Sequence, residues 1–338
     1  PVTKTHVDIS TFVPTKLPQG LLTTFWNGPL SRGFTWQTDT SVTETKLWLL
    51  KGEYDQDDGS TFVDGGALTE GTCETKTVAG DKEPEDANVH RVHVENLEPG
   101  ATYSFRLGGN GHYVYGRFTV KGVSSCVTAV NFSDTQGKDA PLLYKAEKTA
   151  ALAARTAGDK VDLVVFGGDL VDVGALKKAN HVRYGETVPN TSKSSECMYW
   201  KWGLMTEILA PYFQGVPWIM APGNHDYKHY RDMTAVDYYT TGMSFAGCSS
   251  VDVGNVHFVE LPFLGTYKGD GVIAEYAAAF NWLDADLKAS SARWKVVSVH
   301  WGPYTTGDHG TGRDDGDNSA EGVCDMVKAL TPILSRNH

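Results

Sequence analysis

The sequence predicts an all-β sandwich followed by a layered α/β domain, and three observations carry this prediction. Short runs of alternating apolar and polar residues recur up to about residue 122, with no helical stripe between them. Beyond that point apolar strands alternate with helices, which is the order typical of layered α/β domains. The length of 338 residues exceeds one ordinary domain and suits two. We therefore expect a sandwich over residues 1–122 and an α/β domain over residues 123–338.

The first half contains five segments with the period of two that half-buried antiparallel strands show. The turn Glu98-Pro99-Gly100 precedes Tyr103, a layout like the tyrosine corner of β-sandwiches. We expect this half to be all-β. The five predicted strands are 33–38, 45–50, 89–94, 102–107 and 113–118.

The second half opens with an apolar strand over 127–132, followed by a helix. Asp139 is the candidate N-cap of that helix, Pro141 lies in its first turn, and Gly158 can end it in the left-handed conformation. Ligands bind beyond the carboxyl ends of the strands in such domains, so the site is expected there. The later predicted elements are strand 161–166, helix 199–213, strand 216–220, a hairpin near 251–261, helix 273–287 and strand 295–299.

Composition and charge exclude several classes of protein. Thirty basic and 41 acidic residues give a net charge of −11, which argues against nucleic-acid binding and against docking on an anionic membrane. No apolar run approaches the roughly 20 residues that span a bilayer. We therefore expect neither a nucleic acid nor a membrane span, with a homo-oligomer or an assembly partner left open.

The chain begins at Pro1 without an apolar signal segment, which suggests a mature exported form. We expect a secreted or extracellular protein, with a lysosome or vacuole as the alternative. Asn190 lies in a polar glycosylation sequon, whereas the sequon at Asn131 falls inside an apparently buried strand. The five cysteines are odd in number, so at least one is free or pairs outside this sequence.

Metal-ligand side chains follow four of the predicted strands. Hard oxygen ligands mixed with imidazole suit zinc, manganese or iron, so the four loops predict a metal centre at one rim of the domain. The runs are Ser133-Asp134-Thr135-Gln136, Gly168-Asp169 with Asp172, Gly223-Asn224-His225-Asp226, and Val299-His300.

This ordered set resembles the calcineurin-like metallophosphoesterases. The pairing with a leading sandwich resembles their purple acid phosphatase branch, as do the segments 97–107 and 253–259. The resemblance covers nearly the whole chain, and its Gly-Asn-His-Asp motif is quite specific. It implies a two-layer-sandwich metallophosphoesterase domain with α/β/β/α layers, preceded by a fibronectin-III-like domain.

The resemblance also implies two divalent or trivalent metal ions, iron, zinc or manganese. Asp169 would bridge them, Asp134 would hold one ion, and Asn224 and His300 would hold the other. Paired cations turn water into hydroxide near neutral pH and neutralise charge in the transition state of phosphoryl transfer.

Two histidines would serve the substrate, by the same resemblance. His225 would steady the transferring phosphoryl group or protonate the leaving oxygen, and His309 resembles in position the substrate-side histidines of the branch. The implied activity is hydrolysis of phosphomonoesters, or of nucleotide or lipid-head-group diesters.

The sequence departs from the family pattern in three places. Gln136 stands where most members have histidine, and Asp172 stands where the purple branch has tyrosine, so no purple colour is expected. Both remain candidate oxygen ligands. The chain stops at His338, before the Gly-His-x-His loop that closes the family's site, so the domain looks truncated. The assumed fold also suggests a Cys197–Cys248 disulfide.

These departures leave two readings open. The first is a metal-dependent phosphoesterase. The second is a catalytically degraded protein of the same fold, kept as an extracellular binding or assembly component with an eroded metal site.

Overall fold

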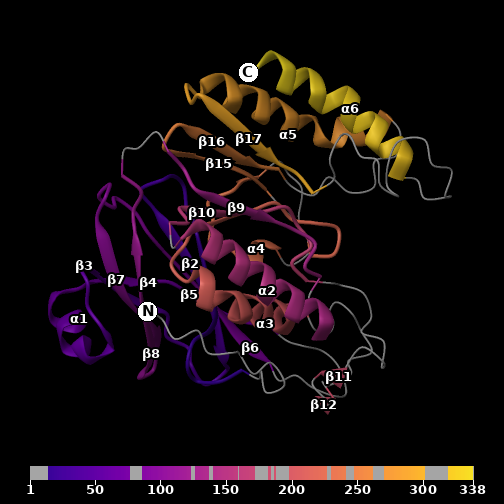
Figure 1. Cartoon of the computed structure of the whole chain (residues 1–338). Coiled ribbons are helices and arrows are strands. Elements are labelled where there is room, and N and C mark those ends of the chain that lie inside the picture. Colours follow the sequence, from indigo (N-terminus) through magenta and orange to yellow (C-terminus); the bar gives the residue numbers. More distant parts are fainter. Residues whose placement is uncertain are drawn as a thin grey trace.

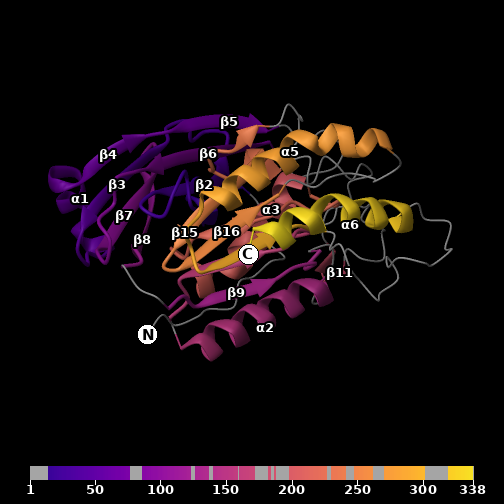
Figure 2. The same cartoon turned by 90° about the horizontal axis from the view of Figure 1, so that it is seen from above.

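The chain forms two stacked β-layers with helices on their outer faces, joined to a smaller β-sandwich, in a computed structural model (Figures 1 and 2). In the described residues no helix is long and apolar enough to cross a membrane. The structure describes residues 14–76, 86–122, 126–136, 140–158, 160–171, 182–183, 186–187, 198–226, 230–240, 247–261, 270–300 and 319–337.

The N-terminal sandwich has two layers around one apolar core, as the alternating pattern predicts. Phe34 and Trp36 from one layer meet Phe105 and Leu107 from the other, and all four are fully buried. The fibronectin-III-like identity of this part stays a prediction. One layer contains β1 (Gln19–Thr24), β2 (Arg32–Asp39), β5 (Thr72–Lys76) and β6 (Ala87–Val94), and the other contains β3 (Lys46–Lys51), β4 (Ala67–Glu70), β7 (Thr102–Gly109) and β8 (His112–Thr119).

The turn before β7 is held as the tyrosine-corner layout suggests, because the Glu98 backbone N–H donates to the Tyr103 hydroxyl at 3.1 Å. The expectation of a helix-free first half is wrong. A 3₁₀ turn (Gln56–Asp58) leads into α1 (Gly59–Gly65), whose Phe62 is fully buried. This helix spans only two turns, too few for a helical stripe to show in the sequence.

One sheet runs through both halves of the chain. Its strand order is β5-β6-β2-β1-β13-β10-β9, and Thr24 of β1 pairs in parallel with Trp218 of β13 (Trp218–Met220). The segment before β14 (Tyr239–Thr240) strengthens the junction, since Thr24 donates to the Ala235 carbonyl at 2.7 Å. A Cβ on Gly33 would lie 1.8 Å from that carbonyl oxygen, so only glycine permits this approach. The predicted boundary at residue 122 stays a prediction.

Helices α2 (Ala140–Ala157) and α3 (Met198–Phe213) cover the outer face of β9 (Ala129–Phe132), β10 (Leu163–Phe166) and β13. Ala146 and Ala150 of the predicted stripe are buried in this layer, and Gly158 ends α2 with a φ of 62°, as expected. Two further strands, β11 (Val182–Arg183) and β12 (Glu186–Thr187), form a separate hairpin.

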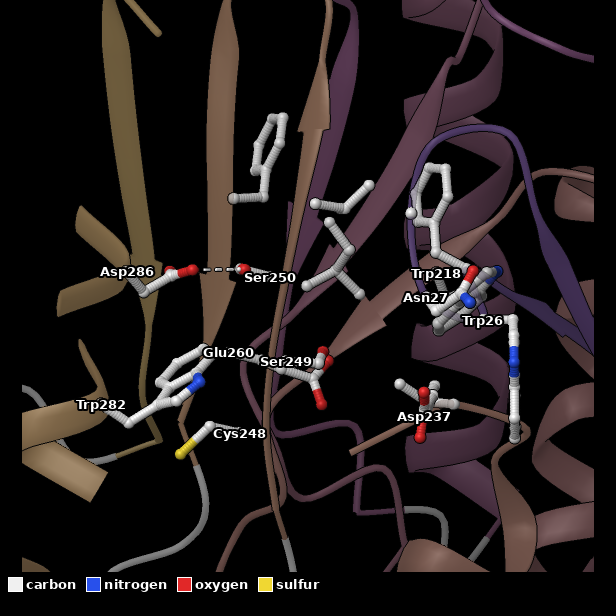
Figure 3. A pocket seen from close by; sticks show the side chains of 16 residues that line it. Trp26, Asn27, Trp218, Asp237, Cys248, Ser249, Ser250, Glu260, Trp282 and Asp286 are labelled. Carbon is white, nitrogen blue, oxygen red and sulfur yellow. Dashed lines mark hydrogen bonds between the residues drawn. The ribbon is translucent and has the colours of Figure 1, made fainter. Parts of the chain in front are cut away.

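A second sheet, of order β14-β15-β16-β17, packs on the inner face of the first. Phe25, Val165, Ile219 and Phe258 fill the space between the layers, and a cavity lies beside this core (Figure 3). The outer face is covered by two helices, which completes the predicted α/β/β/α order. These elements are β15 (Gly247–Val253), β16 (Val256–Glu260), β17 (Trp294–Ser298), α5 (Asp270–Ala289) and α6 (Ser319–Arg336), with the short α4 (Tyr230–Met233) near the first sheet.

The sheet edges correct one prediction. Asn131 is exposed, not buried, because β9 is the edge strand of its sheet. On β17, the edge of the other sheet, Trp294 is 58% exposed.

The expected Cys197–Cys248 disulfide is absent, because Cys248 carries a free thiol. That thiol is fully buried among the apolar side chains beneath α5, where cysteine packs as a small hydrophobe. Cys197 and Asn190 lie outside the described residues.

Candidate metal centre

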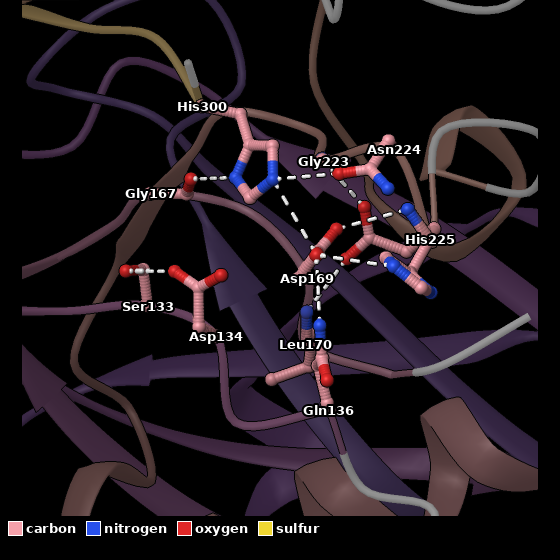
Figure 4. Close-up of polar contacts among 11 residues, drawn as sticks. Ser133, Asp134, Gln136, Gly167, Asp169, Leu170, Gly223, Asn224, His225 and His300 are labelled. Carbon is pink, nitrogen blue, oxygen red and sulfur yellow. Dashed lines mark hydrogen bonds and ion pairs between the residues drawn. The ribbon is translucent and has the colours of Figure 1, made fainter. Parts of the chain in front are cut away.

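The centre lies where four strands end. Strands β9, β10 and β13 pair in parallel, so their carboxyl ends meet at one edge and carry Asp134, Asp169 and Asn224. Strand β17 brings His300 from the second sheet (Figure 4). The four predicted loops therefore converge, and the ligand atoms of Asp134, Asp169 and His300 lie within 4.8 Å of one another.

Asp169 is the centre of the cluster and is almost fully buried. Its Oδ1 accepts the backbone N–H of His225 at 2.9 Å. Its Oδ2 lies 3.4 Å from His300 Nε2 and 3.9 Å from His225 Nε2, and it accepts the Gln136 amide at 3.2 Å. One carboxylate thus faces side chains from the three other loops.

The backbone of both aspartate loops is unusual. Asp134, Gln136 and Asp169 all have positive φ, at 56°, 41° and 59°. Such angles are uncommon for residues other than glycine, and they cluster at functional sites where the surrounding structure enforces them. Here the Asp134 N–H donates to the Gly168 carbonyl at 3.0 Å and the Gln136 N–H to the Asp169 carbonyl at 2.9 Å. The two loops hold each other in place.

Two glycines allow the loops to approach. A Cβ on Gly223 would lie 2.0 Å from Asp169 Oδ1, and one on Gly168, whose φ is 99°, would lie 2.6 Å from His300 Nδ1. Any other residue at either position would push a ligand side chain out of place.

His300 is oriented as metal-ligating histidines are. Its Nδ1 lies 2.8 Å from the Gly167 carbonyl oxygen, which can only accept, so Nδ1 carries a proton. The other nitrogen, Nε2, faces Asn224 Oδ1 at 3.0 Å and Asp169 Oδ2 at 3.4 Å (Figure 4). Nε2 is therefore the atom available to a metal ion.

The distances from His300 Nε2 to the oxygens of Asn224 and Asp169 fit a shared metal ion. Ligand atoms that each lie about 2.0–2.2 Å from one ion are roughly 3.0–3.5 Å apart from one another. Nε2 of His300 has this spacing to both oxygens. The set of imidazole, carboxylate and amide suits zinc, manganese or iron.

Asp134 and Gln136, from the loop after β9, lie on the side of Asp169 away from Asn224 (Figure 4). The Asp134 carboxylate is exposed and accepts the Ser133 hydroxyl at 2.5 Å, which orients it beside Asp169. Gln136 presents its amide nitrogen to Asp169, and its carbonyl oxygen would face the centre only after the amide turns over. A second ion on this side would have Asp134 and Asp169 as its carboxylates.

The charges within the cluster shift two pKa values in opposite directions. Burial alone would raise the pKa of Asp169, but the hydrogen bond and charge of His300 hold it below its ordinary value. Burial would lower the pKa of His300, whereas the facing Asp169 raises it above the ordinary value. Asp169 is thus ionised and ready to bind a cation.

Asp226 is a site residue whose role the sequence did not show. Its fully buried carboxylate accepts the Leu170 N–H and the Gly223 N–H, each at 2.7 Å. It thereby ties the Asp169 loop to the Asn224 loop from behind. Burial and the nearby charge of Asp169 raise its pKa to about 7. The only signal in the sequence is the place of Asp226 at the end of the Gly-Asn-His-Asp run.

Two predicted site residues, Asp172 and His309, lie outside the described residues. The other six, Asp134, Gln136, Asp169, Asn224, His225 and His300, all belong to the described cluster.

A family model described as calcineurin-like phosphoesterase matches residues 128–331, which is more than half of the chain. The match includes all four metal-ligand loops and begins just before β9. No curated protein matches the sequence.

The structure is similar to a purple acid phosphatase, PPD1, isolated from yellow lupin (Lupinus luteus) seeds. The TM-score is 0.56 and the identity 15%, over 87% of this chain. The likeness therefore concerns the fold. The chain spans about half the length of the lupin protein, of which 52% is covered. Astrotactin-2 matches over 43% of this chain and 29% of its own, with 14% identity and a TM-score of 0.23, too low to support a fold comparison.

Proposed function

Because the chain belongs to the calcineurin-like phosphoesterase family, we propose that it hydrolyses phosphate esters at a centre of two metal ions. The observation that carries the proposal is the convergence of Asp134, Asp169, Asn224 and His300 from four separate loops. Carboxylate, amide and imidazole donors at this spacing match the chemistry that bound iron, zinc or manganese requires.

Each residue has a distinct task in this proposal. Asp169 would bridge the two ions, His300 and Asn224 would complete one site, and Asp134 would belong to the other. When bound, the ions supply a water of lowered pKa and neutralise charge on the phosphoryl group. The chain's own contribution is to hold these ligands rigidly, through the Gly167 carbonyl behind His300 and the backbone bonds behind the aspartates.

His225 is suited to act on the substrate. Its backbone N–H is fixed by Asp169 Oδ1, and its partly exposed ring has Nε2 at 3.9 Å from Asp169 Oδ2. From this position the imidazole can donate a hydrogen bond to a phosphoryl oxygen or a proton to the leaving oxygen. Asp172 as a further ligand and His309 as a substrate-side residue remain part of the proposal. The substrates are small phosphomonoesters or diesters, in a secreted, lysosomal or vacuolar setting.

One observation favours a second function. Gln136 gives Asp169 Oδ2 a hydrogen bond, where a second metal ion would need an electron pair. If the amide stays in this orientation, the site holds one ion or none. The chain would then be a degraded member of the family that acts as an extracellular binding or assembly component.

Metal analysis followed by hydrolysis of p-nitrophenyl phosphate tests the proposal. Purified protein is supplied with iron, zinc or manganese, and its metal content and turnover are measured beside those of Asp169→Asn. We expect near two ions per chain and at least about a thousandfold loss of turnover in the variant, as expected from losing metal-assisted catalysis. Asp64→Asn, an exposed carboxylate on α1, is the matched control. No bound metal and no hydrolysis in the wild-type protein would favour the binding component.

A further inference from the structure

Glu260 is a buried side chain that joins the two stacked sheets. It is the last residue of β16 in the second sheet, and it is 2% exposed. Its Oε2 accepts the backbone N–H of Met220, on β13 of the first sheet, at 3.0 Å. Its Oε1 accepts the hydroxyl of Tyr230, on α4, at 2.9 Å. One side chain therefore connects three elements from different parts of the fold.

The bond to Met220 satisfies a backbone donor that the first sheet leaves without a strand partner. Alternate N–H groups of a strand point to opposite neighbours. Ala221 donates to Phe166 of β10, so the Met220 N–H points to the other side, where β1 lies. β1 pairs with β13 at one position only, through its last residue, Thr24. The carboxyl group of Glu260 takes the place of the missing strand beyond that point, as a buried N–H requires.

The two bonds hold both ends of the segment that carries Asn224. Met220 comes four residues before Asn224, and Tyr230 comes six residues after it. Tyr230 is itself firmly placed, since it is fully buried and its ring packs edge-on against Trp202 of α3. Asn224 is therefore tied to Glu260 on both sides along the chain.

Glu260 also lies beside the strand that leads to His300. In the second sheet Glu260 pairs with Ser298 of β17, and the Leu261 N–H donates to the Ser298 carbonyl at 3.0 Å. His300 follows Ser298 by two residues. Since Asn224 and His300 come from different sheets, Glu260 is a direct link between the two strands that present them.

The carboxyl group is satisfied without a counter-charge. Burial raises the pKa of Glu260 to about 8, so at neutral pH it is mostly an uncharged carboxylic acid. Ser249 and Tyr238 also form hydrogen bonds with it, and their hydroxyl groups can accept its proton. Glutamine, which is neutral and has the same shape, should therefore replace Glu260 with little change.

We propose that Glu260 is a positioning residue of the metal centre, which holds Asn224 and His300 at the spacing that one ion needs. The core between the two sheets consists of apolar side chains such as Val165 and Phe258, which pack without directional bonds. The hydrogen bonds of Glu260 are directional, so they set how the two sheets lie against each other. We rest this inference on the proposed function, because it takes Asn224 and His300 as ligands.

Zinc titration of Glu260→Leu and Glu260→Gln, by competition with a chelator, tests the proposal. Leucine has a similar size and forms no hydrogen bond. Zinc affinity should therefore fall by at least about tenfold, the lower limit for loss of an outer partner of a metal site. The glutamine amide can accept from Met220 and donate to the Tyr230 hydroxyl, so Glu260→Gln should bind zinc almost as tightly as the wild-type protein.

Thr206→Val is the matched control. The buried hydroxyl of Thr206, on α3, donates to the Gly20 carbonyl at 3.0 Å, so this variant also loses a buried hydrogen bond between two elements. It should lower the midpoint of urea unfolding and keep the zinc affinity. Equal loss of zinc affinity in Glu260→Leu and Thr206→Val would show a general effect of lower stability and would overturn the proposal.

A second measurement needs no metal. His300 Nε2 lies 3.0 Å from Asn224 Oδ1, so protons of the ring and of the Asn224 amide are close enough for a nuclear Overhauser effect. We expect this effect in metal-free wild type, Glu260→Gln and Thr206→Val, and its loss in Glu260→Leu. If the wild-type protein binds no zinc, the proposed function fails, and this effect alone decides whether Glu260 positions the two side chains.

Tyr230→Phe keeps the test open if Glu260→Leu does not fold. It removes one of the two bonds to Glu260 and keeps the buried ring. We expect zinc affinity to fall by a few-fold and the contact between His300 and Asn224 to weaken. Unchanged affinity and an unchanged contact, in this variant or in Glu260→Leu, would mean that Glu260 does not position the centre.

Discussion

Two histidines of this chain face carboxylates in different ways. His300 has one ring nitrogen on the Gly167 carbonyl and the other turned toward Asp169 and Asn224. His257, on β16, has both nitrogens on carboxylates, with Nδ1 at 2.8 Å from Asp252 and Nε2 at 2.8 Å from Asp286. Each histidine also has a pKa raised by its acidic neighbours against the effect of burial.

The difference is the one expected between a proposed metal ligand, His300, and a structural ion pair. Asp286, beside His257, has both oxygens engaged, because Ser250 donates to its other oxygen at 2.8 Å. Both ring nitrogens of His257 are held by carboxylates, so neither is left for a metal ion. At His300 the orienting partner is a neutral carbonyl, and Nε2 shares its surroundings with oxygens from two further loops. A histidine beside aspartates is therefore a metal ligand only where one ring nitrogen is left to a converging set of donors.

His300→Gln should have the largest effect and should act on metal binding alone. We expect metal affinity and hydrolysis to fall by more than about 100-fold, because loss of mere outer partners of a metal site already costs roughly 10–100-fold. The glutamine amide can still donate to the Gly167 carbonyl, so the midpoint of urea unfolding for the metal-free protein should change little. Metal content, p-nitrophenyl phosphate turnover and urea unfolding are the measurements. Unchanged metal content would place His300 outside the centre.

His257→Gln should show the opposite pattern. The side chain of His257 is buried and bridges the β15–β16 hairpin to α5, so its loss leaves Asp286 without a positive partner. Breaking a fully buried ion pair costs roughly 3–5 kcal/mol. Because Asp252 is 59% exposed, we expect His257→Gln to lower the free energy of unfolding by about 2–3 kcal/mol. Metal content should equal that of the wild-type protein. A variant that loses metal but keeps its stability would reverse the comparison.

The sequence predicted the metal loops better than it predicted their surroundings. Asp134, Asp169, Asn224 and His300 follow strands, and parallel strands end at a common edge, so their convergence follows from the topology. The bonds of Asp226 and the donor role of Gln136 depend on side-chain orientations across two loops, which no local pattern encodes.

The fold was likewise predicted from the sequence only in part. Strands with a clear period of two and helices with an apolar stripe, such as α3, were predicted within a few residues of their true ends. The pairing of β1 with β13 was not foreseen, because it joins segments almost 200 residues apart through one register pair. Helix α6 was also missed. Its first residues directly follow a run rich in aspartate and glycine, residues 308–318, whose composition is typical of loops.

The smallest predicted effect is the pH dependence of the His257 contribution to stability. Burial opposes its charged form, but the hydrogen bonds to Asp286 and Asp252 raise its pKa above the ordinary value near 6.5. The folded state therefore holds the proton more tightly than the unfolded state. The stability that this proton contributes is fully present below pH 6.5 and is lost as the pH rises through the folded pKa.

The difference in unfolding free energy between wild type and His257→Gln should accordingly be largest near pH 6 and shrink toward pH 9. Urea unfolding at several pH values in this range measures it. Other titrating groups, including Glu260 with its pKa of about 8, are present in both proteins and cancel in the difference. A difference that stays constant with pH would mean that neutral His257 packs as well as the charged form, and that the two carboxylates contribute nothing through charge.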